Sequence, residues 1–288
     1  MYQPNQTEQQ SGKYFFAMFC IYVFLSFLGQ SILIGLVQSG TTLYNCLVSL
    51  IAPISLMVVI IYAKVKQNKS FKQLTQLNGF SKKHLPLSVL LFVAMLLGLG
   101  FVNGVFAHFL KNLGLNLPQS QVTVNSVGEL IVYGVTLCLI PAVVEELFFR
   151  GLILGQVKNG KPIYSILYVG VLFALYHASP TQLIYQFIYG GLLTLLAIVC
   201  KSVIPCIITH FLNNFTIILL SFLRINLNLY SWYVIVIGLA CLTVFVAVTI
   251  KMLKKQSFTP QQSSVYFNLY SILGGVLCLM MIGLTLTA

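Results

Sequence analysis

Residues 141–151 read Pro-Ala-Val-Val-Glu-Glu-Leu-Phe-Phe-Arg-Gly and lie inside the apolar run 127–157. The whole chain has only four acidic residues, and two of them, Glu145 and Glu146, stand side by side in this run. An ionised carboxylate without a partner costs several kcal/mol in hydrocarbon, so carboxylates persist there where they pair, face water or take part in chemistry. The glutamate pair therefore predicts a functional site inside an apolar segment.

The composition predicts a membrane protein. Hydrophobic residues make up 58% of the 288 positions and charged residues only 7%, which is more apolar than a soluble domain of this length requires. Runs of about 20 apolar residues predict membrane-spanning helices. Nine runs meet this description, and eight spans are also compatible with the pattern; the runs are 14–37, 43–63, 86–110, 127–157, 163–179, 181–200, 203–223, 229–252 and 266–287. The expected fold is an all-α, polytopic transmembrane helical bundle.

The domain organisation follows from these runs. Residues 1–13 are predicted to form a polar cytoplasmic tail. Residues 14–288 are predicted to form a single polytopic membrane domain, because no loop between the runs is long enough for a soluble domain. The first run is longer than the apolar region of a signal peptide, so we expect it to be a retained anchor.

The basic residues lie mainly in the gaps between the apolar runs. Lysine-rich loops stay in the cytoplasm, so nine spans with a cytoplasmic amino terminus give a strongly asymmetric arrangement. The side predicted to be cytoplasmic carries Lys13, Lys64, Lys66, Lys69, Lys72, Lys82, Lys83, Lys158, Lys161, Lys201, Lys251, Lys254 and Lys255. Only Lys111 and Arg224 are expected on the other side. The net charge of +12 is thus explained by topology in a lipid bilayer, and we expect no nucleic acid partner.

The spacing of two charged residues predicts an ion pair in the run 127–157. Glu146 and Arg150 are four residues apart with the acid first, which is the favourable order for a pair on one helix face. Glu145 is rotated about 100° from that pair. Its carboxylate is therefore left without a partner from its own helix, and Glu145 is the better candidate for a base.

Two histidines lie in later apolar runs. His177 follows Phe173 by one helical turn, and His210 precedes Asn214 by one turn. With a rise of 1.5 Å per residue, Glu145, both histidines and Asn214 come out at about 10 to 21 Å from the cytoplasmic ends of their spans. Helix tilt can bring groups at these depths into one layer, so we expect them to converge.

Each of these side chains also has a structural explanation when taken alone. An ion pair can join helices, an intramembrane histidine can serve only as a hydrogen-bonding group between helices, and Phe173 is a typical packing residue. Taken together, a carboxylate, two imidazoles and a carboxamide supply a base, a group that orients water or donates a proton, and two oxyanion donors. The combination predicts a hydrolytic site.

The three patterns are Glu-Glu-x-x-x-Arg (145–150), Phe-x-x-x-His (173–177) and His-x-x-x-Asn (210–214), in that order on successive hydrophobic segments. In these motifs the chain resembles the CPBP family of intramembrane endopeptidases, also called the CAAX protease and bacteriocin-processing or Abi family. The Ras-converting CAAX endopeptidase is its eukaryotic relative. The resemblance places the catalytic core at residues 127–223.

The resemblance implies peptide-bond hydrolysis within the membrane. Glu145 and His177 would activate a water molecule, and no cofactor would be required. His210 and Asn214 would hold the oxyanion. The supporting side chains would be Glu146, Arg150 and Phe173. The implied substrates are membrane-associated peptides, either of the prenylated type or leader peptides, and the implied location is a bacterial plasma membrane.

Zinc is the alternative to a metal-free site. One carboxylate and two imidazoles can form a zinc site, and its ligands here would be Glu145, His177 and His210. No His-Glu-x-x-His motif is present, and too few ligands remain if His210 and Asn214 are oxyanion donors. We therefore predict a glutamic-type endopeptidase, with a metallopeptidase as the alternative.

Two functions outside this class stay open. One is a non-catalytic bacteriocin immunity or scaffold protein that keeps the fold, and the other is an ion or proton pathway through the glutamate pair. A secondary transporter is expected to show paired halves with broken helices, and the sequence has no such internal symmetry.

Overall fold

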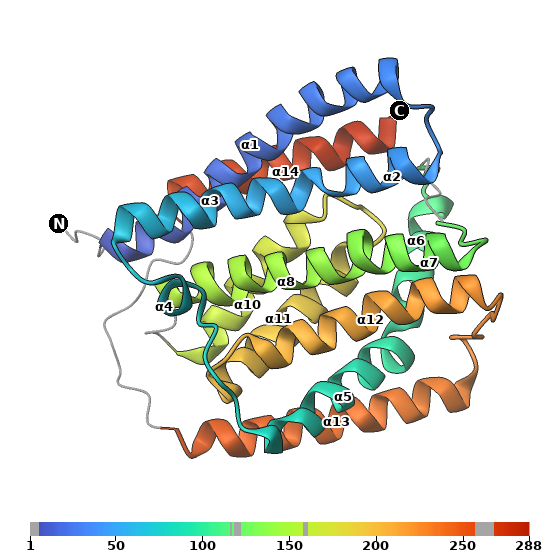
Figure 1. The fold of residues 1–288 in the computed structure, drawn as a ribbon. Helices are drawn as coiled ribbons and strands as arrows, with labels where there is room; N and C mark the ends of the chain where they lie inside the picture. The colour runs from blue at the N-terminus through green and yellow to red at the C-terminus, as the bar shows by residue number, and fades with distance from the viewer. Residues whose placement is uncertain (1–5, 116, 118–121, 158–160, 257–267, 288) are drawn as a thin grey trace.

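The computed structural model describes residues 6–115, 117, 122–157, 161–256 and 268–287, and these contain helices and no strand (Figure 1). The α-helices are α1 (Gln6–Leu36), α2 (Thr42–Ser49), α3 (Ile51–Gln67), α4 (Phe71–Thr75), α5 (Leu85–Val93), α6 (Gly100–Asn112), α7 (Val127–Tyr133), α8 (Ile140–Glu146), α9 (Leu154–Val157), α10 (Pro162–Tyr176), α11 (Leu183–Cys200), α12 (Ile204–Phe222), α13 (Trp232–Lys254) and α14 (Leu269–Thr287). Four shorter helical turns are η1 (Lys82–His84), η2 (Ala94–Gly98), η3 (Gly134–Leu139) and η4 (Leu147–Ile153).

The helices form a polytopic bundle, and the predicted fold class is confirmed. Seven helical stretches of the described chain are long and apolar enough to cross a membrane: Gln10–Leu36, Thr42–Gln67, Lys82–Asn112, Val127–Val157, Leu183–Cys200, Ile204–Phe222 and Trp232–Lys254. Two further apolar helices, Pro162–Tyr176 and Leu269–Leu284, are shorter. These nine segments correspond to the nine predicted runs, and the count of full spans stays approximate.

The first helix begins earlier than the apolar pattern predicts. Helix α1 starts at Gln6, so residues 6–13 of the predicted polar tail continue the helix, while residues 1–5 lie outside the described chain. Ser11 is fully buried, and its hydroxyl lies 3.1 Å from the Tyr168 hydroxyl. This polar contact inside the bundle explains why the helix extends beyond its apolar part.

The segment with the glutamate pair is one long helix with two π-helical turns. Turn η3 comes directly before α8 and turn η4 directly after it. A π turn widens the helix by one residue, and such turns are frequent at functional sites. Pro141 lies just past η3 inside this continuous helix, where it removes one backbone hydrogen bond to the preceding turn. Glu145 and Glu146 thus lie in a short α-helical piece between two wide turns.

Helices α10 and α11 form a short hairpin inside the bundle. At 1.5 Å per residue, α10 with 15 residues spans about 22 Å, less than the roughly 30 Å of hydrocarbon, while α11 with 18 residues spans about 27 Å. Gly190 allows the two helices to pack closely, because a Cβ atom at this position would lie 3.0 Å from the Phe173 side chain. Because α10 is too short to cross the hydrocarbon, we expect the connection 177–182 at membrane depth, where irregular backbone is tolerated if it lines a cavity, as His177 and Gln182 do.

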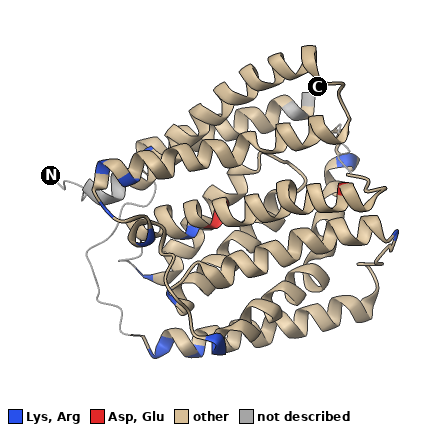
Figure 2. Ribbon diagram, viewed as in Figure 1, with Lys and Arg blue, Asp and Glu red and all other residues tan. Residues whose placement is uncertain are grey.

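The two ends of the bundle differ in charge, as Figure 2 shows. We call the end with the carboxyl-terminal turns of α3 and α13 the lysine-rich end; these turns carry Lys64, Lys66, Lys251 and Lys254. We call the opposite end, where α6 finishes with Lys111, the lysine-poor end. These four lysines, which the sequence places on one side, thus lie at one end of the bundle, while Lys158 lies outside the described residues.

Candidate active site

A buried ion cluster lies at the centre of the site. Glu146 and Arg150 are fully buried, and Arg150 Nη1 donates a 2.9 Å hydrogen bond to Glu146 Oε1. The same carboxylate oxygen lies 2.9 Å from His210 Nδ1, which comes from α12. The ion pair expected from the i, i+4 spacing is present, and it extends to a histidine 64 residues further along the chain.

Arg150 joins three helices. Its Nη2 donates a 2.9 Å hydrogen bond to the carbonyl oxygen of Gly190 in α11. Its guanidinium carbon lies 4.3 Å from the centre of the Phe173 ring, which belongs to α10. A desolvated cation over an aromatic face is attracted to the ring quadrupole. Phe173 is thus more than a packing residue, because it covers the charge of the arginine.

Glu145 lies on the other side of His210 from Glu146. Its side chain is mostly buried, and the Tyr176 hydroxyl donates a 3.4 Å hydrogen bond to Glu145 Oε1. Glu145 Oε2 lies 4.0 Å from His210 Nε2 and makes no hydrogen bond within the described part of the chain. His210 therefore stands between the two glutamates, closely bound to Glu146 and loosely approached by Glu145.

The backbone holds His177 in one orientation. His177 is the residue that ends α10, and its Nδ1 lies 2.8 Å from the carbonyl oxygen of Phe173. Because a carbonyl only accepts hydrogen bonds, Nδ1 carries the proton and donates it. In the neutral ring Nε2 is then left as the acceptor. The ring also packs edge-on against Phe173 and Tyr176, at 4.6 and 5.3 Å between centroids.

Asn214 is held through its neighbour. The Tyr185 hydroxyl donates to Asn213 Oδ1 at 3.3 Å, and Asn213 Nδ2 donates to Asn214 Oδ1 at 3.4 Å. Because its oxygen already accepts this bond, the Nδ2 group of Asn214 is the part that serves as a donor. Asn213 itself is buried.

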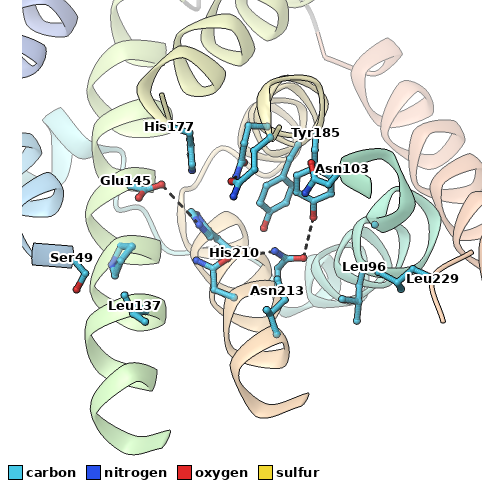
Figure 3. A pocket seen from close by; sticks show the side chains of 17 residues that line it. Ser49, Leu96, Asn103, Leu137, Glu145, His177, Tyr185, His210, Asn213 and Leu229 are labelled. Atoms are coloured by element: carbon cyan, nitrogen blue, oxygen red, sulfur yellow. Dashed lines mark hydrogen bonds and ion pairs between the residues drawn. The ribbon is translucent and has the colours of Figure 1, made fainter. Parts of the chain in front are cut away.

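All four residues predicted for the chemistry line one cavity of about 740 Å³ (Figure 3). They are Glu145, His177, His210 and Asn214, and they come from three helical segments. Figure 3 shows Glu145, His177 and His210 directed toward the same space. The remaining lining residues are Ser49, Leu96, Gly100, Asn103, Leu137, Pro141, Gln182, Tyr185, Gln186, Tyr189, Asn213, Ile217 and Leu229. The expected convergence of these side chains is therefore present in the fold.

Sequence reasoning missed several polar groups of the site. Tyr176 contacts Glu145, and Tyr185 contacts Asn213. Tyr189 lines the cavity, with its ring centre 5.7 Å from that of His210. The spacing of Tyr185 and Tyr189 by one helical turn was a usable signal, because it places two polar tips on one face of an apolar helix.

The described residues contain no group of three His, Cys, Asp or Glu side chains arranged to hold a metal ion. The zinc alternative would need Glu145, His177 and His210 together. One nitrogen of His210 already contacts Glu146, so it could bind a metal only through Nε2. A zinc ion there would require these side chains to move closer together than they stand.

Comparison with known families addresses the motifs directly. The model of the type II CAAX prenyl endopeptidase Rce1-like family matches residues 127–216. This segment is similar to that family. The match covers about a third of the chain and contains all three motifs, so the predicted resemblance to CAAX proteases is confirmed for this part. No curated protein matches the chain. The match supports a CAAX-type endopeptidase and does not decide between a glutamic and a metal-dependent mechanism.

The ion cluster of the Rce1-like segment predicts a strong effect on stability. Glu146→Gln leaves the buried Arg150 without its counter-ion, and Arg150→Gln leaves the carboxylate with His210 as its remaining partner. Removing one partner of a buried ion pair costs about 3–5 kcal/mol. We expect each variant to lose its folded state at a lower temperature in detergent, measured by thermal denaturation.

The double variant Glu146→Gln/Arg150→Gln removes both charges and should recover part of this loss. Lys64→Gln, at an exposed position of the lysine-rich end, is the matched control and should leave the transition unchanged. Single variants as stable as the parent would show that the ion cluster does not stabilise the fold.

Proposed function

We propose that the protein is an intramembrane endopeptidase that hydrolyses peptide bonds of membrane-associated peptides with a water molecule activated by Glu145. The observation that carries this proposal is the position of Glu145 Oε2, which is mostly buried, makes no hydrogen bond in the described chain and faces a cavity shared with two imidazoles. A carboxylate held in this way is available to take a proton from water.

His177 is the second group for water activation in this proposal. Its Nδ1–H is engaged by the Phe173 carbonyl, so Nε2 presents a lone pair toward the cavity. A ring with a fixed orientation can hold a water molecule beside the base without a reorganisation step. Glu145 and His177 then act on the same water, one as the base and the other as the orienting acceptor.

His210 and Asn214 are the proposed oxyanion donors. They lie one helical turn apart on α12 and line the same cavity. His210 Nδ1 contacts Glu146 Oε1, so Nε2 is the ring nitrogen left to donate to an oxyanion. Donors fixed before the reaction stabilise the charge that develops on a tetrahedral intermediate.

Glu146, Arg150 and Phe173 act as positioning residues. The Glu146 carboxylate fixes the His210 ring, and Arg150 fixes that carboxylate while tying α11 to the same point. Phe173 supports both sides, because its carbonyl orients His177 and its ring covers Arg150. Supporting contacts of this kind hold reactive groups within the narrow range that catalysis requires.

The proposed substrates are peptides of the prenylated type or leader peptides, and the proposed location is a bacterial plasma membrane with the amino terminus in the cytoplasm. The distribution of lysines between the two ends of the bundle supports that orientation. The apolar helices support the bilayer as the surroundings of the enzyme.

Glu145→Gln should abolish cleavage and leave the protein folded. The amide keeps the shape of the carboxylate and cannot act as a general base, and loss of a base lowers the rate by about 10²- to 10⁴-fold. The measurement is the hydrolysis of a library of internally quenched peptides by purified protein in liposomes, together with thermal denaturation.

Glu129→Gln provides the matched control, because Glu129 lies at the lysine-poor end of the same long helix and contacts Thr42. It should cleave at the parental rate. A Glu145→Gln variant that turns over like the parent would refute the assignment, and a parent that cleaves no peptide would favour a scaffold or ion pathway.

Asn214→Ala tests the oxyanion donors. The interaction forms mainly in the transition state, so kcat should fall by roughly 10²- to 10³-fold while KM changes little. Steady-state kinetics on one cleaved peptide gives both constants. Asn228→Ala, in an exposed connection outside the cavity, should leave both unchanged. A rise in KM with unaltered kcat would show that Asn214 binds substrate and does not stabilise the oxyanion.

We also propose that the reaction needs no metal, and chelation tests this directly. Treatment with 1,10-phenanthroline should leave the rate unchanged. One equivalent of zinc in active enzyme, with activity that follows its removal and return, would instead establish the metallopeptidase. In that case His177→Ala and His210→Ala should each lose the bound metal, as elemental analysis would show.

A further inference from the structure

Residues 70–78, which contain α4 and which we call the α4 cap, pack against η4 on the lysine-rich side of the site. The Gln76 side-chain amide donates hydrogen bonds of 3.1 and 3.0 Å to the carbonyl oxygens of Arg150 and Gly151. A Cβ atom on Gly151 would lie 2.5 Å from the Thr75 carbonyl oxygen, so the two backbones touch. The cap is therefore packed directly against the π turn that carries Arg150.

The α4 cap is also fixed to the turn between α11 and α12. Asn78 Nδ2 donates to the Lys201 carbonyl at 3.2 Å, and the Ser202 hydroxyl donates to the Asn78 carbonyl at 2.6 Å. The Val203 backbone N–H donates to the Gln76 carbonyl at 3.3 Å. These bonds bridge two segments that flank the ion cluster, so the cap is fixed on two sides.

The cavity extends in the opposite direction. On the long helix the lining continues from Glu145 to Leu137, about 12 Å closer to the lysine-poor end. On α12 it continues from His210 to Ile217, about 10 Å in the same direction. Leu229, in the connection between α12 and α13 at the lysine-poor end, also lines it. No residue of the α4 cap and no lysine is among the lining residues.

Neutral polar side chains line this part of the cavity. Asn103 and Gln186 lie on α6 and α11, and Asn103 Oδ1 and Gln186 Oε1 are buried without a hydrogen bond in the described chain. A buried acceptor without a partner is unfavourable until a ligand supplies a donor. The backbone N–H groups of an extended peptide are such donors. The lining thus suits an uncharged stretch of peptide backbone.

We infer that the substrate enters the site through the lysine-poor half of the bundle. The substrate would be an extended peptide segment of a membrane-anchored protein, located on the extracytoplasmic side of the membrane. The inference combines the α4 cap, the course of the cavity and the rule that lysine-rich ends face the cytoplasm. The cleavage of this peptide in the site rests on the proposed endopeptidase function. The direction of access rests on the course of the cavity, the α4 cap and the position of the lysines, and it does not depend on catalysis.

Access can be measured without any catalytic step. The Asn103→Cys and Ile217→Cys variants place a thiol in the cavity, and Ser70→Cys places one at the exposed start of the α4 cap. Right-side-out and inverted vesicles of a bacterial membrane are treated with a maleimide that cannot cross bilayers, and mass spectrometry locates the label. Because the labelled residue is identified, labelling of the native cysteines is distinguished from labelling of the introduced thiol. Labelling in detergent verifies that each introduced thiol reacts.

We expect both cavity variants to be labelled in right-side-out vesicles and not in inverted ones, and Ser70→Cys to show the reverse. Cavity thiols labelled from the same side as Ser70→Cys, or from neither side, would overturn the course of access. Cavity thiols labelled only in inverted vesicles, with Ser70→Cys labelled only in right-side-out ones, would overturn the extracytoplasmic assignment. The bundle would then be inserted in the opposite orientation.

A second measurement links access to cleavage. A polar quenched peptide that cannot cross the membrane should be hydrolysed when added to right-side-out vesicles and not when added to inverted ones. Hydrolysis in inverted vesicles alone would overturn the inference. The expected labelling with no hydrolysis on either side would instead refute the endopeptidase and leave the course of the cavity established.

Discussion

The site depends on one buried electrostatic interaction, the contact of the Glu146 carboxylate with Arg150 and His210. Burial makes each of these charged groups unfavourable alone, so each holds the others in place. The same arginine reaches the Gly190 carbonyl and the Phe173 ring, which ties two further helices to this point. The positions of the reactive groups are therefore set by the requirement to neutralise a charge within the bundle.

The short α10–α11 hairpin gives this arrangement its shape. Because α10 ends at His177, the chain leaves helical structure at a depth where its backbone must line polar space. The end of α10 also frees the Phe173 carbonyl to accept from the imidazole, since the last carbonyls of a helix lack intrahelical partners. A helix long enough to cross the bilayer would have offered neither the cavity nor this acceptor.

Local spacing made a large part of the site predictable. The Glu146–Arg150 pair follows from helix geometry, and the rise per residue places Glu145 and the two histidines at depths that helix tilt can bring together. The Tyr176 and Asn213 contacts could not be predicted, because they depend on how neighbouring helices rotate against each other. The start of α1 at Gln6 was missed for a related reason, since its polar residues pack against a helix far away in the sequence.

The glutamate pair lies in seven α-helical residues between two π-helical turns, and this has a consequence for helix register. A π turn is a one-residue insertion, and a one-residue change rotates everything beyond it by about 100°. That is the angle that separates Glu145 from Glu146. If either wide turn moved along the helix and past the pair, Glu145 would turn out of the position that faces the cavity, although no residue had been replaced. Which of the two glutamates contacts Arg150 and which faces the cavity is therefore encoded in where the helix widens as well as in the residues themselves.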